Sequence, residues 1–444
     1  MDPKGDSDIQ KFYANTTVFV TGGTGFLGKH LIEKLFRYIT KMYLLIRTKK
    51  GKPIKERLEE MLEDPIFSTL QKYQPDFSSR LVCVEGDVSE IRLGLTERDW
   101  QMLADEVSEG FNEQNDLQNG RAAAFATRGV LQSFLNAVLF IRSFIHVSTA
   151  YCHTTTDSEG QEVKEGFYST PIPPETLLHL VEDIDELIKN WPNTYTFCKA
   201  VGEEVVRTMS EGLPISIIRP SIGEVQINIT LLITSLLLFQ LLLGVGIGVI
   251  HVMLNDHKVK LGLIPCEYVT NAAIGELLDT YHCFHWLIYR TLHAIDSIRH
   301  HRWCRFGGVE WKERNECHFF ISRFVKLSKK MQKMVLSFSY FLLHEWIFLD
   351  DNTDKLYKNL TEKDKLIFNF DVTNINWTEF MIIWCIGVRK YILKDGLKST
   401  DKGVRKQFWF GLLHYFLSCV YFYLLWQVVS ISYYVCKSLF VLVF

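Results

Sequence analysis

The stretch Val18-Phe-Val-Thr-Gly-Gly-Thr-Gly-Phe-Leu-Gly28 lies near the N-terminus and decides the fold of the chain. A β-branched and aromatic run enters a glycine cluster, and the helical pattern of residues 29–36 follows, so the segment predicts a strand, a tight turn and a helix. Its glycines match the dinucleotide-binding fingerprint, in which the phosphates bind at the helix N-terminus; the alternative is a glycine turn without a ligand. The residues that we predict to bind a cofactor here are Thr21, Gly22, Gly23, Gly25, Phe26, Leu27 and Gly28.

The charge that follows the second predicted strand distinguishes between cofactors. Residues 42–46 are apolar and read as a strand, and Arg47 and Lys49 come directly after it. An acidic residue at this position would bind a ribose hydroxyl, whereas a base suits the 2′-phosphate of NADPH. We therefore predict NADPH, bound by Arg47 with help from Lys49; the alternative is that both are ordinary solvated loop charges.

An acidic residue follows the third predicted strand. Residues 81–84 read as that strand, and Gly86, Asp87 and Val88 come after it. At the carboxyl edge of a doubly wound sheet, Asp87 and Val88 would meet the adenine side of the dinucleotide. Asp87 could equally form an Asx turn or a helix cap, and both interpretations stay open.

A tyrosine and a lysine at helical spacing supply candidate chemistry. Tyr195 and Lys199 lie four residues apart in a helical pattern that runs to about residue 209, so they share one face, and the ammonium can lower the pKa of the phenol. Residues 141–147 read as a strand that leads into Ser148 and Thr149, whose hydroxyls can orient a carbonyl oxygen. We predict that Tyr195 is a general acid in carbonyl reduction, the alternative being a plain surface pair.

The composition of the chain indicates a protein that faces the cytosol and is attached to a membrane. The formal net charge is −2, which does not favour nucleic acid, and the ten cysteines form no C-x-x-C pair, which indicates reduced thiols facing the cytosol. Residues 408–436 contain no Asp, Glu, Lys or Arg and are long enough to cross a bilayer once, or to turn back within it. Basic residues at 389–406 keep the N-terminal bulk cytosolic by the positive-inside rule. A second apolar run, 229–254, favours a substrate wall over a span.

These motifs together carry a family resemblance. The motifs that carry the resemblance are the glycine turn, Arg47, Gly86-Asp87, His146-Val-Ser-Thr-Ala-Tyr-Cys152, Tyr195-Thr-Phe-Cys-Lys199 and Ile218-Arg-Pro-Ser-Ile222. They resemble an extended short-chain dehydrogenase, and their sequences are closest to those of the fatty acyl-CoA reductases, especially those of insects. Residues 342–391 are similar to the C-terminal domain of that family. The resemblance covers the chain from about residue 15 to residue 400.

The resemblance implies reduction of a long-chain acyl-CoA by NADPH, through an aldehyde, to a primary alcohol and free CoA. It implies that Tyr195 is the acid, that Lys199 holds the nicotinamide ribose and tunes Tyr195, and that Thr149, or else Ser148, holds the carbonyl oxygen. It also implies attachment to the membrane of the endoplasmic reticulum or the peroxisome. Two rivals remain: a dehydrogenase of sterols or other lipid alcohols, and a catalytically impaired membrane protein that binds lipid or acyl-CoA.

The expected architecture is α/β, with a Rossmann-like doubly wound parallel sheet, a smaller and mostly helical C-terminal domain and an apolar membrane tail. The expected units are an NADP-binding domain at 14–275, a divergent linker at 276–319, the helical domain at 320–400 and a membrane span at 408–436.

Two departures from the family support the impaired alternative. The family has a strand between Val107 and Phe111, and here we expect that strand to be missing; Ala126 also stands where the family has a water-holding Asn. Histidines and cysteines gather in residues 282–318, but their spacing matches no zinc motif, and no metal is predicted.

Overall fold

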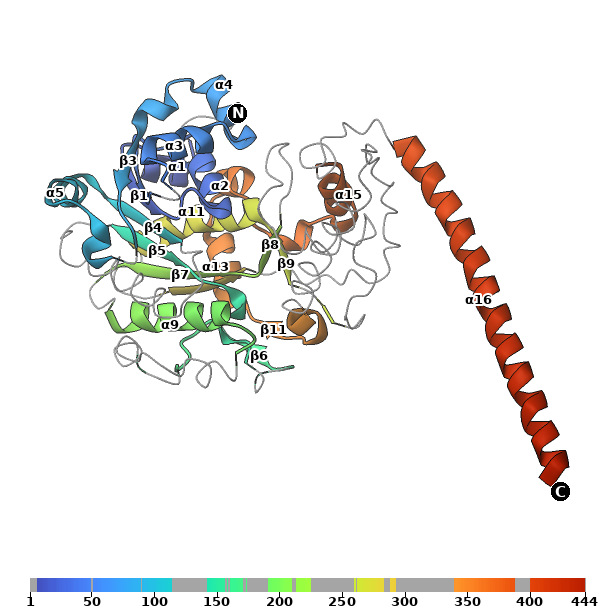
Figure 1. Cartoon of the computed structure of the whole chain (residues 1–444). Helices are drawn as coiled ribbons and strands as arrows, with labels where there is room; N and C mark the ends of the chain where they lie inside the picture. The colour runs from blue at the N-terminus through green and yellow to red at the C-terminus, as the bar shows by residue number, and fades with distance from the viewer. Residues whose placement is uncertain are drawn as a thin grey trace.

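A seven-stranded parallel sheet is the centre of the computed structural model (Figure 1). The spatial order of its strands is β10-β7-β5-β4-β1-β2-β3, so the chain runs outward from β1 in one direction and then returns to build the other half. This reversal beside β1 defines a doubly wound sheet, and ligands of such sheets bind at the carboxyl edge where the order reverses. The strands are β1 (Thr17–Thr21), β2 (Lys41–Ile46), β3 (Leu81–Glu85), β4 (Glu109–Glu113), β5 (Ser143–Val147), β7 (Ile215–Pro220) and β10 (Ile288–Leu292).

The structure describes residues 6–48, 51–88, 90–113, 142–155, 158, 160–170, 173, 191–209, 213–224, 259–260, 262–282, 288–292, 339–387 and 400–443. The apolar run at 229–254, the predicted cofactor residue Lys49 and Ala126 lie outside these ranges. Within the histidine- and cysteine-rich stretch at 282–318, the structure describes residue 282 and the residues of β10, 288–292.

The first βαβ unit has the predicted form. β1 pairs in parallel with β2, with Val18 opposite Met42 and Val20 opposite Leu44, and α2 (Phe26–Leu35) connects the two strands. Strand β3 then pairs with β2, and α3 (Ile54–Leu62) lies between them in sequence. The strands predicted at residues 42–46 and 81–84 are thus confirmed.

The strand that we expected to be missing is present. β4 is a central member of the sheet, with Phe111 opposite Val20 of β1 on one side and opposite Ile145 of β5 on the other. The prediction was wrong because Glu109-Gly110-Phe-Asn-Glu113 has little β propensity of its own. Pairing with a neighbour on each side, and burial of Glu109 against Ser143, override that weak local preference.

Helices cover both faces of the sheet, because successive residues of a strand point to opposite sides. Val18 and Val20 pack in a core with α2 and with α11 (Cys266–His282), whereas Phe19 packs in a second core. That second core contains Leu103 of α5 (Glu97–Glu106) and Val205 of α9 (Thr194–Met209). In Figure 1, α2 and α11 accordingly lie on the opposite side of the sheet from α9.

The C-terminal segment packs on the sheet domain. It contains α13 (Asp351–Asn359), α14 (Glu362–Ile367) and α15 (Trp377–Gly387). Phe368 and Phe370 belong to the same core as α2 and α11, and Lys34 of α2 donates a hydrogen bond to the carbonyl oxygen of Ile367 at 3.1 Å. The two-stranded pairing of β6 (Glu162–Val163) with β11 (Ile347–Phe348) makes a second junction. The units predicted at 14–275, 276–319 and 320–400 stay predictions; β10 lies within the second of them and pairs with β7.

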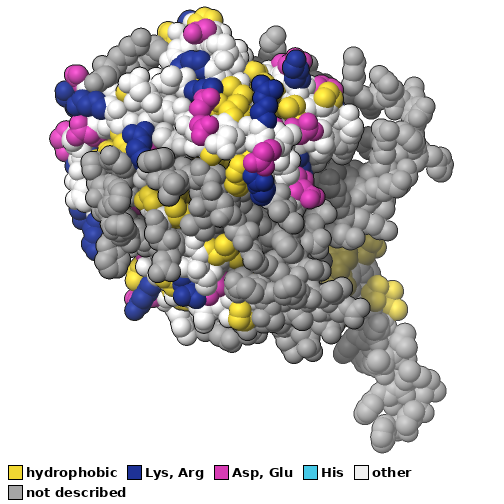
Figure 2. Space-filling model, turned by 90° about the vertical axis from the view of Figure 1, so that its left-hand side faces the viewer, with side chains coloured by type: hydrophobic (Ala, Val, Ile, Leu, Met, Phe, Trp, Pro, Cys, Tyr) yellow, Lys and Arg dark blue, Asp and Glu magenta, His cyan; other side chains and the backbone are white. Residues whose placement is uncertain are grey.

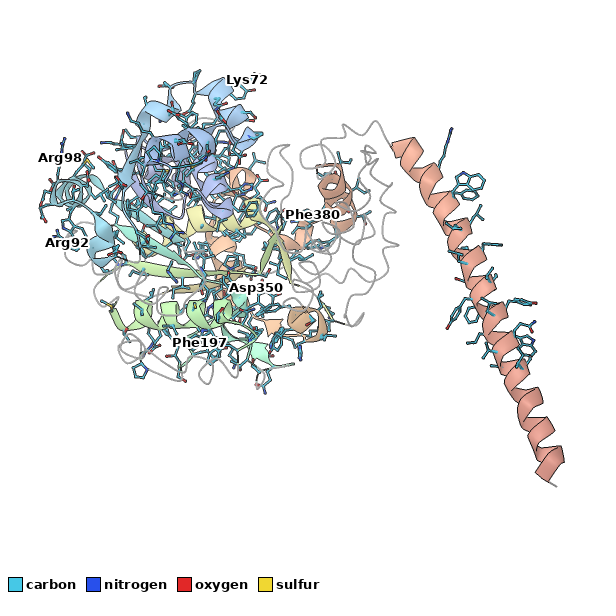
Figure 3. The ribbon with its side chains drawn as sticks, in the orientation of Figure 1. Lys72, Arg92, Arg98, Phe197, Asp350 and Phe380 are labelled. Carbon is cyan, nitrogen blue, oxygen red and sulfur yellow. The ribbon has the colours of Figure 1, made fainter. Side chains whose placement is uncertain are left out.

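One long helix, α16 (Thr400–Val443), extends away from the rest of the molecule (Figure 1). Within it, Gly411–Ile431 is long and apolar enough to cross a membrane. Its described side chains project into open space, as Figure 3 shows, and apolar residues such as Phe416 and Trp426 are exposed. The face of the molecule in Figure 2 instead carries basic and acidic side chains interspersed.

Candidate active site

The glycine turn joins β1 to α2 with the geometry of a phosphate-binding loop. Gly22 has a φ of 72°, which favours glycine, and its carbonyl oxygen accepts a hydrogen bond from the N–H of Gly25 at 2.8 Å. A Cβ at Gly28 would lie 2.5 Å from the carbonyl oxygen of Gly22, so only glycine lets the helix pack this close to the turn. Gly25 caps α2 without a side-chain hydrogen bond, which leaves backbone N–H groups of the first helical turn for an anion. The turn therefore fits a dinucleotide pyrophosphate.

Two guanidinium groups lie at the neighbouring strand end. Nη1 of Arg47, after β2, is 3.7 Å from Oδ2 of Asp87, after β3, and Arg57 of α3 donates a hydrogen bond to the carbonyl oxygen of Arg47. Burial and the charge of Arg47 lower the pKa of Arg57. The structure thus brings together Arg47 and Asp87, whereas Val88 is half-buried and packs against the core that contains Phe19. Arg57 was not predicted, although its place on the helix after β2 was an available signal.

The hydroxyl-bearing loop begins where β5 ends. Ser148 donates its N–H to the carbonyl oxygen of Ile218 at 2.7 Å, and Thr149 donates its hydroxyl to the carbonyl oxygen of Pro220 at 3.3 Å. Both residues are buried. The loop is therefore held beside the end of β7, at the same carboxyl edge of the sheet as the glycine turn.

Tyr195 and Lys199 lie in the first two turns of α9, which packs under this loop. Nζ of Lys199 donates a hydrogen bond to the carbonyl oxygen of Val147 at 2.8 Å and lies 5.9 Å from the centroid of the Tyr195 ring. Lys199 is buried and Tyr195 is half-buried. The predicted pair thus shares one helix face, and that face is directed at the end of β5 and not at open solvent.

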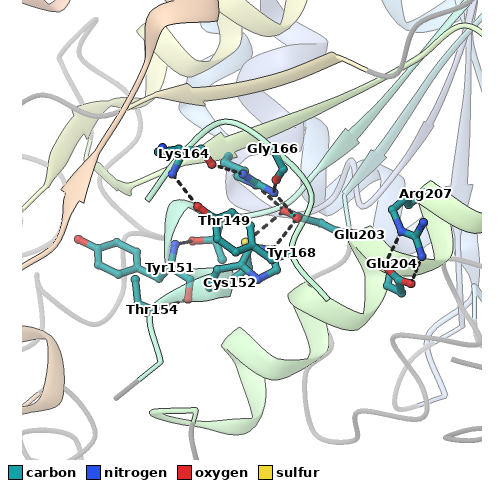
Figure 4. Close-up of polar contacts among 12 residues, drawn as sticks. Thr149, Tyr151, Cys152, Thr154, Lys164, Gly166, Tyr168, Glu203, Glu204 and Arg207 are labelled. Atoms are coloured by element: carbon teal, nitrogen blue, oxygen red, sulfur yellow. Dashed lines mark hydrogen bonds and ion pairs between the residues drawn. The ribbon is translucent and has the colours of Figure 1, made fainter. Parts of the chain in front are cut away.

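A buried cluster beneath the loop was not predicted. It is centred on Glu203 of α9, whose carboxylate contacts the thiol of Cys152, the imidazole of His153 and the guanidinium of Arg219 (Figure 4). The spacing of Lys199 and Glu203, again four residues, was the signal that could have indicated a further inward-facing side chain.

The Cys152, His153 and Glu203 group has the residue types of a metal site but not the arrangement. Arg219 occupies both carboxylate oxygens of Glu203, with Nε 2.9 Å from Oε1 and an Nη 2.6 Å from Oε2. Burial, followed by the charge of Glu203, raises the pKa of the Cys152 thiol well above its usual range, so the sulfur stays protonated. A cation would therefore meet a fixed positive charge and a neutral thiol, and the cluster does not fit a metal site.

Tyr151 connects the loop to the C-terminal segment. Its ring lies against Phe341, Trp346 and Phe348, with centroid distances of 5.0, 6.1 and 5.2 Å. Burial raises the pKa of the Tyr151 phenol above its usual value, which makes it a poorer acid than a solvated tyrosine. The aromatic contacts instead fix the loop against β11.

The fold and the site together define a class of protein, the nicotinamide-dependent reductases with a Rossmann-like domain. Solved structures with the same fold include the terminal R domain from the myxalamid PKS-NRPS biosynthetic pathway, with a TM-score of 0.58 and 20% identity over 85% of this chain and 93% of that one. The reductase domain of a non-ribosomal peptide synthetase from Mycobacterium tuberculosis has a TM-score of 0.57 and 15% identity, over 87% and 96% of the two chains.

Sequence comparisons narrow the class to a family. Two family models, both described as male sterility protein, match residues 20–273 and 284–395. Fatty acyl-CoA reductase wat of Drosophila melanogaster is 27% identical over 95% of this chain and 92% of its own length. Fatty acyl-CoA reductase 2 of Homo sapiens is 25% identical over 95% and 93%. This chain belongs to the fatty acyl-CoA reductase family and is an oxidoreductase, which confirms the family, the fold class and the enzyme type predicted from the sequence.

Proposed function

We propose that the protein reduces a long-chain acyl-CoA to the primary fatty alcohol, with NADPH as reductant and release of free CoA. The observation that carries the proposal is the position of Lys199, between the Tyr195 ring and the end of β5 that leads into Thr149. An acid, its cationic neighbour and a carbonyl-orienting hydroxyl are thereby gathered at the edge of the sheet where the glycine turn lies. The named activity of the relatives supports the acyl-CoA substrate.

Each residue of the site has a part in two successive reductions. When bound, NADPH would supply one hydride to the carbonyl carbon in each reduction, so two cofactor molecules are used in turn. Thr149 turns its hydroxyl from the carbonyl oxygen of Pro220 to orient the carbonyl oxygen of the substrate, with Ser148 as the second hydroxyl. Tyr195 donates the proton that balances the hydride. In the first reduction the carbon–sulfur bond breaks, and CoA leaves as the thiol with an aldehyde. In the second, the aldehyde becomes the alcohol. Lys199 holds a positive charge beside the phenol and binds the nicotinamide ribose.

Two features support NADPH as the reductant. Arg47 and Arg57 place two guanidinium groups at the strand end where a 2′-phosphate is expected, and a planar guanidinium suits phosphate. Asp87 pairs with Arg47 at this strand end, where the adenine side of the cofactor is expected. Lys49 stays a prediction outside the described residues.

We propose that α16 anchors the enzyme in a membrane, with the sheet domain in the cytosol. The exposed apolar segment Gly411–Ile431 and the basic residues that precede it support this orientation. The enzyme would then lie at the membrane into which its substrate partitions. The endoplasmic reticulum and the peroxisome are the proposed organelles. We further propose the units 14–275, 276–319 and 320–400 as reductase domain, linker and helical domain.

The rival functions make different predictions. The impaired-protein alternative rested on a missing strand and on Ala126; β4 removes the first support, and Ala126 lies outside the described residues. A dehydrogenase of sterols or other lipid alcohols would use the same tyrosine and lysine. The substrate that is turned over therefore distinguishes this alternative from the proposed acyl-CoA reductase.

The test uses membranes that contain the full-length protein. They are incubated with long-chain acyl-CoA and NADPH, and alcohol, free CoA and oxidised cofactor are measured beside a Tyr195→Phe variant. Alcohol from the wild type and its loss in the variant would support the proposal. Oxidation of a sterol by the wild type, without turnover of acyl-CoA, would favour the dehydrogenase.

A further inference from the structure

Helix α9 holds the hydroxyl-bearing loop at both of its ends. At the first end, Lys199 donates its hydrogen bond to the carbonyl oxygen of Val147, directly before Ser148. At the other end, one helical turn further along, Glu203 accepts hydrogen bonds from Cys152 at 3.1 Å and from His153 at 2.9 Å. Thr149 lies between these two attachments. Its place relative to Tyr195 is therefore set by two side chains of the helix that carries Tyr195.

The second attachment is built around a buried ion pair. Glu203 and Arg219 are both fully buried, and two hydrogen bonds join them, of 2.9 and 2.6 Å. Burial alone would raise the pKa of Glu203, but Arg219 and His153 hold the pKa well below its usual range, so the carboxylate is ionised. An ionised carboxylate has the lone pairs to accept from Cys152, His153 and Arg219 at once.

Arg219 extends the cluster in two directions. It belongs to β7, one residue before Pro220, whose carbonyl oxygen accepts the hydroxyl of Thr149. Its remaining N–H groups donate to the carbonyl oxygens of Lys164 at 3.2 Å and Gly166 at 2.8 Å. In Figure 4, dashed lines join this cluster, beside Glu203, to Lys164 and Gly166.

Residues 164–166, to which Arg219 donates its hydrogen bonds, also contact helix α13 in the C-terminal segment. Glu165, between the two carbonyl groups that Arg219 binds, accepts a hydrogen bond from the N–H of Asn352 at 2.6 Å and from the hydroxyl of Thr353 at 3.3 Å, in the first turn of α13. A continuous set of contacts thus runs from α9 through Glu203 and Arg219 to α13.

We propose that Glu203 and Arg219 are positioning residues, which hold the loop from Val147 to His153 so that the hydroxyl of Thr149 faces the substrate beside Tyr195. Neither side chain is assigned contact with substrate or cofactor; both act through the loop. This proposal rests on the proposed function, because it concerns the same reaction. Displacement of a reacting group by about 1 Å can cost 100-fold in rate, so loss of one attachment is expected to lower turnover.

The test compares two neighbouring glutamates of α9 in the full-length protein. Glu203→Gln keeps the volume of the side chain and removes its charge. Glu204→Gln is the matched control, since the Glu204 carboxylate pairs at the surface with Arg207, 2.8 Å from its Nε (Figure 4). We expect Glu203→Gln to lower kcat by at least about tenfold, with KM for acyl-CoA and Kd for NADPH within about twofold of the wild type. Glu204→Gln should leave all three unchanged.

A second readout does not depend on turnover. Hydrogen exchange of the backbone amides in residues 148–155 should be faster in Glu203→Gln than in the wild type and unchanged in Glu204→Gln. If the wild type makes no alcohol, the proposed function fails, while the exchange result still decides whether Glu203 holds the loop. Unchanged kcat and unchanged exchange in Glu203→Gln would overturn the positioning role.

Another pair of variants covers a failure of Glu203→Gln to fold. Removing one member of a buried ion pair leaves an unpaired charge, whereas neutralising both members avoids that cost. The double variant Glu203→Gln with Arg219→Gln should therefore regain thermal stability but keep the low kcat. Recovery of kcat together with stability would show that the pair serves stability alone, and would overturn the proposal.

Discussion

Nζ of Lys199 lies 2.8 Å from the carbonyl oxygen of Val147, and this hydrogen bond joins the helix of the proposed acid to the strand that leads into the proposed carbonyl-orienting hydroxyls. Through this bond, Lys199 holds the loop after β5 in place, in addition to placing a positive charge beside Tyr195. It fixes the position of the ammonium before any cofactor binds, so the charge beside Tyr195 is preorganised.

Replacement of Lys199 by methionine should therefore lower kcat by about 100-fold or more, because both the charge beside the phenol and the attachment of the loop are lost. The matched control is Lys34→Met. Lys34 is another buried lysine that donates to a backbone carbonyl, that of Ile367 at 3.1 Å, far from the loop. Both variants should lose thermal stability, but kcat should fall only in Lys199→Met. Equal kcat values for the two variants would contradict the assignment.

The glycine turn gives a prediction about cofactor binding. In Gly28→Ala the new Cβ would lie 2.5 Å from the carbonyl oxygen of Gly22, and backbone on both sides leaves it no room. We expect a stability loss of about 1–3 kcal/mol and at least about tenfold weaker NADPH binding. Gly275→Ala, in α11, is the control, because its Cβ would meet Phe370 at an ordinary 3.6 Å. Thermal unfolding and cofactor titration check both variants, and unchanged NADPH affinity in Gly28→Ala would argue against a phosphate site at the turn.

The choice of cofactor can be tested at Arg47. Arg47→Asp replaces a partner of the expected 2′-phosphate by a like charge, and a charged hydrogen bond contributes about 1.5–3 kcal/mol, so NADPH binding should weaken by about 10- to 100-fold. NADH, which lacks this phosphate, should bind the variant at least as well as the wild type. Arg98→Asp, at an exposed position of α5, should change neither affinity. Tighter binding of NADH than of NADPH by the wild type would overturn the prediction.

The buried start of β4 predicts a pH dependence of stability. Burial raises the pKa of Glu109 to about 8, against the opposing effects of Ser143 and Arg142. Since the folded chain holds this proton more tightly than the unfolded chain, the stabilisation is fully present below about pH 4.5 and is lost as the pH rises to about 8. The slope for one proton is about 1.4 kcal/mol per pH unit.

Chemical denaturation of the wild type and Glu109→Gln between pH 5 and pH 8 measures this contribution. The free energy of unfolding of the variant should fall less with rising pH than that of the wild type. Glu106→Gln should keep the wild-type slope, because the hydrogen bonds of Lys41 and Tyr43 lower the pKa of the exposed Glu106. Parallel curves for Glu109→Gln and the wild type would show that Glu109 is ionised in the folded protein.

Local patterns sufficed for the elements that carry strong local signals. The glycine turn, the apolar residues of β2 and β3 and the helical spacing of Tyr195 and Lys199 are all visible in short windows, and the structure has the predicted elements there. β4 has no such signal: Glu109 and Asn112 disfavour a strand, and only the two flanking strands make one.

The site divides in the same way. Residues of the glycine turn and the Tyr195–Lys199 pair could be chosen from their spacing, because each group lies in one element. The contacts of Glu203 and Arg219 could not be predicted in this way, since they join segments that are far apart in the chain. Glu203 meets Cys152 51 residues away, and Arg219 meets Lys164 55 residues away. Neither contact leaves a periodic pattern in the sequence.

The central claim is that one site adds two hydrides to the carbonyl carbon of an acyl-CoA. The most direct measurement supplies the membrane-bound enzyme with long-chain acyl-CoA and NADPH deuterated at the transferred position, and determines the mass of the product. We expect a primary alcohol with two deuterium atoms on C1 and two NADPH oxidised per CoA released. This product should be lost in Tyr195→Phe but not in Tyr73→Phe, the control at an exposed site. Release of CoA without deuterium in the product, or a deuterated alcohol that persists in Tyr195→Phe, would contradict the central claim.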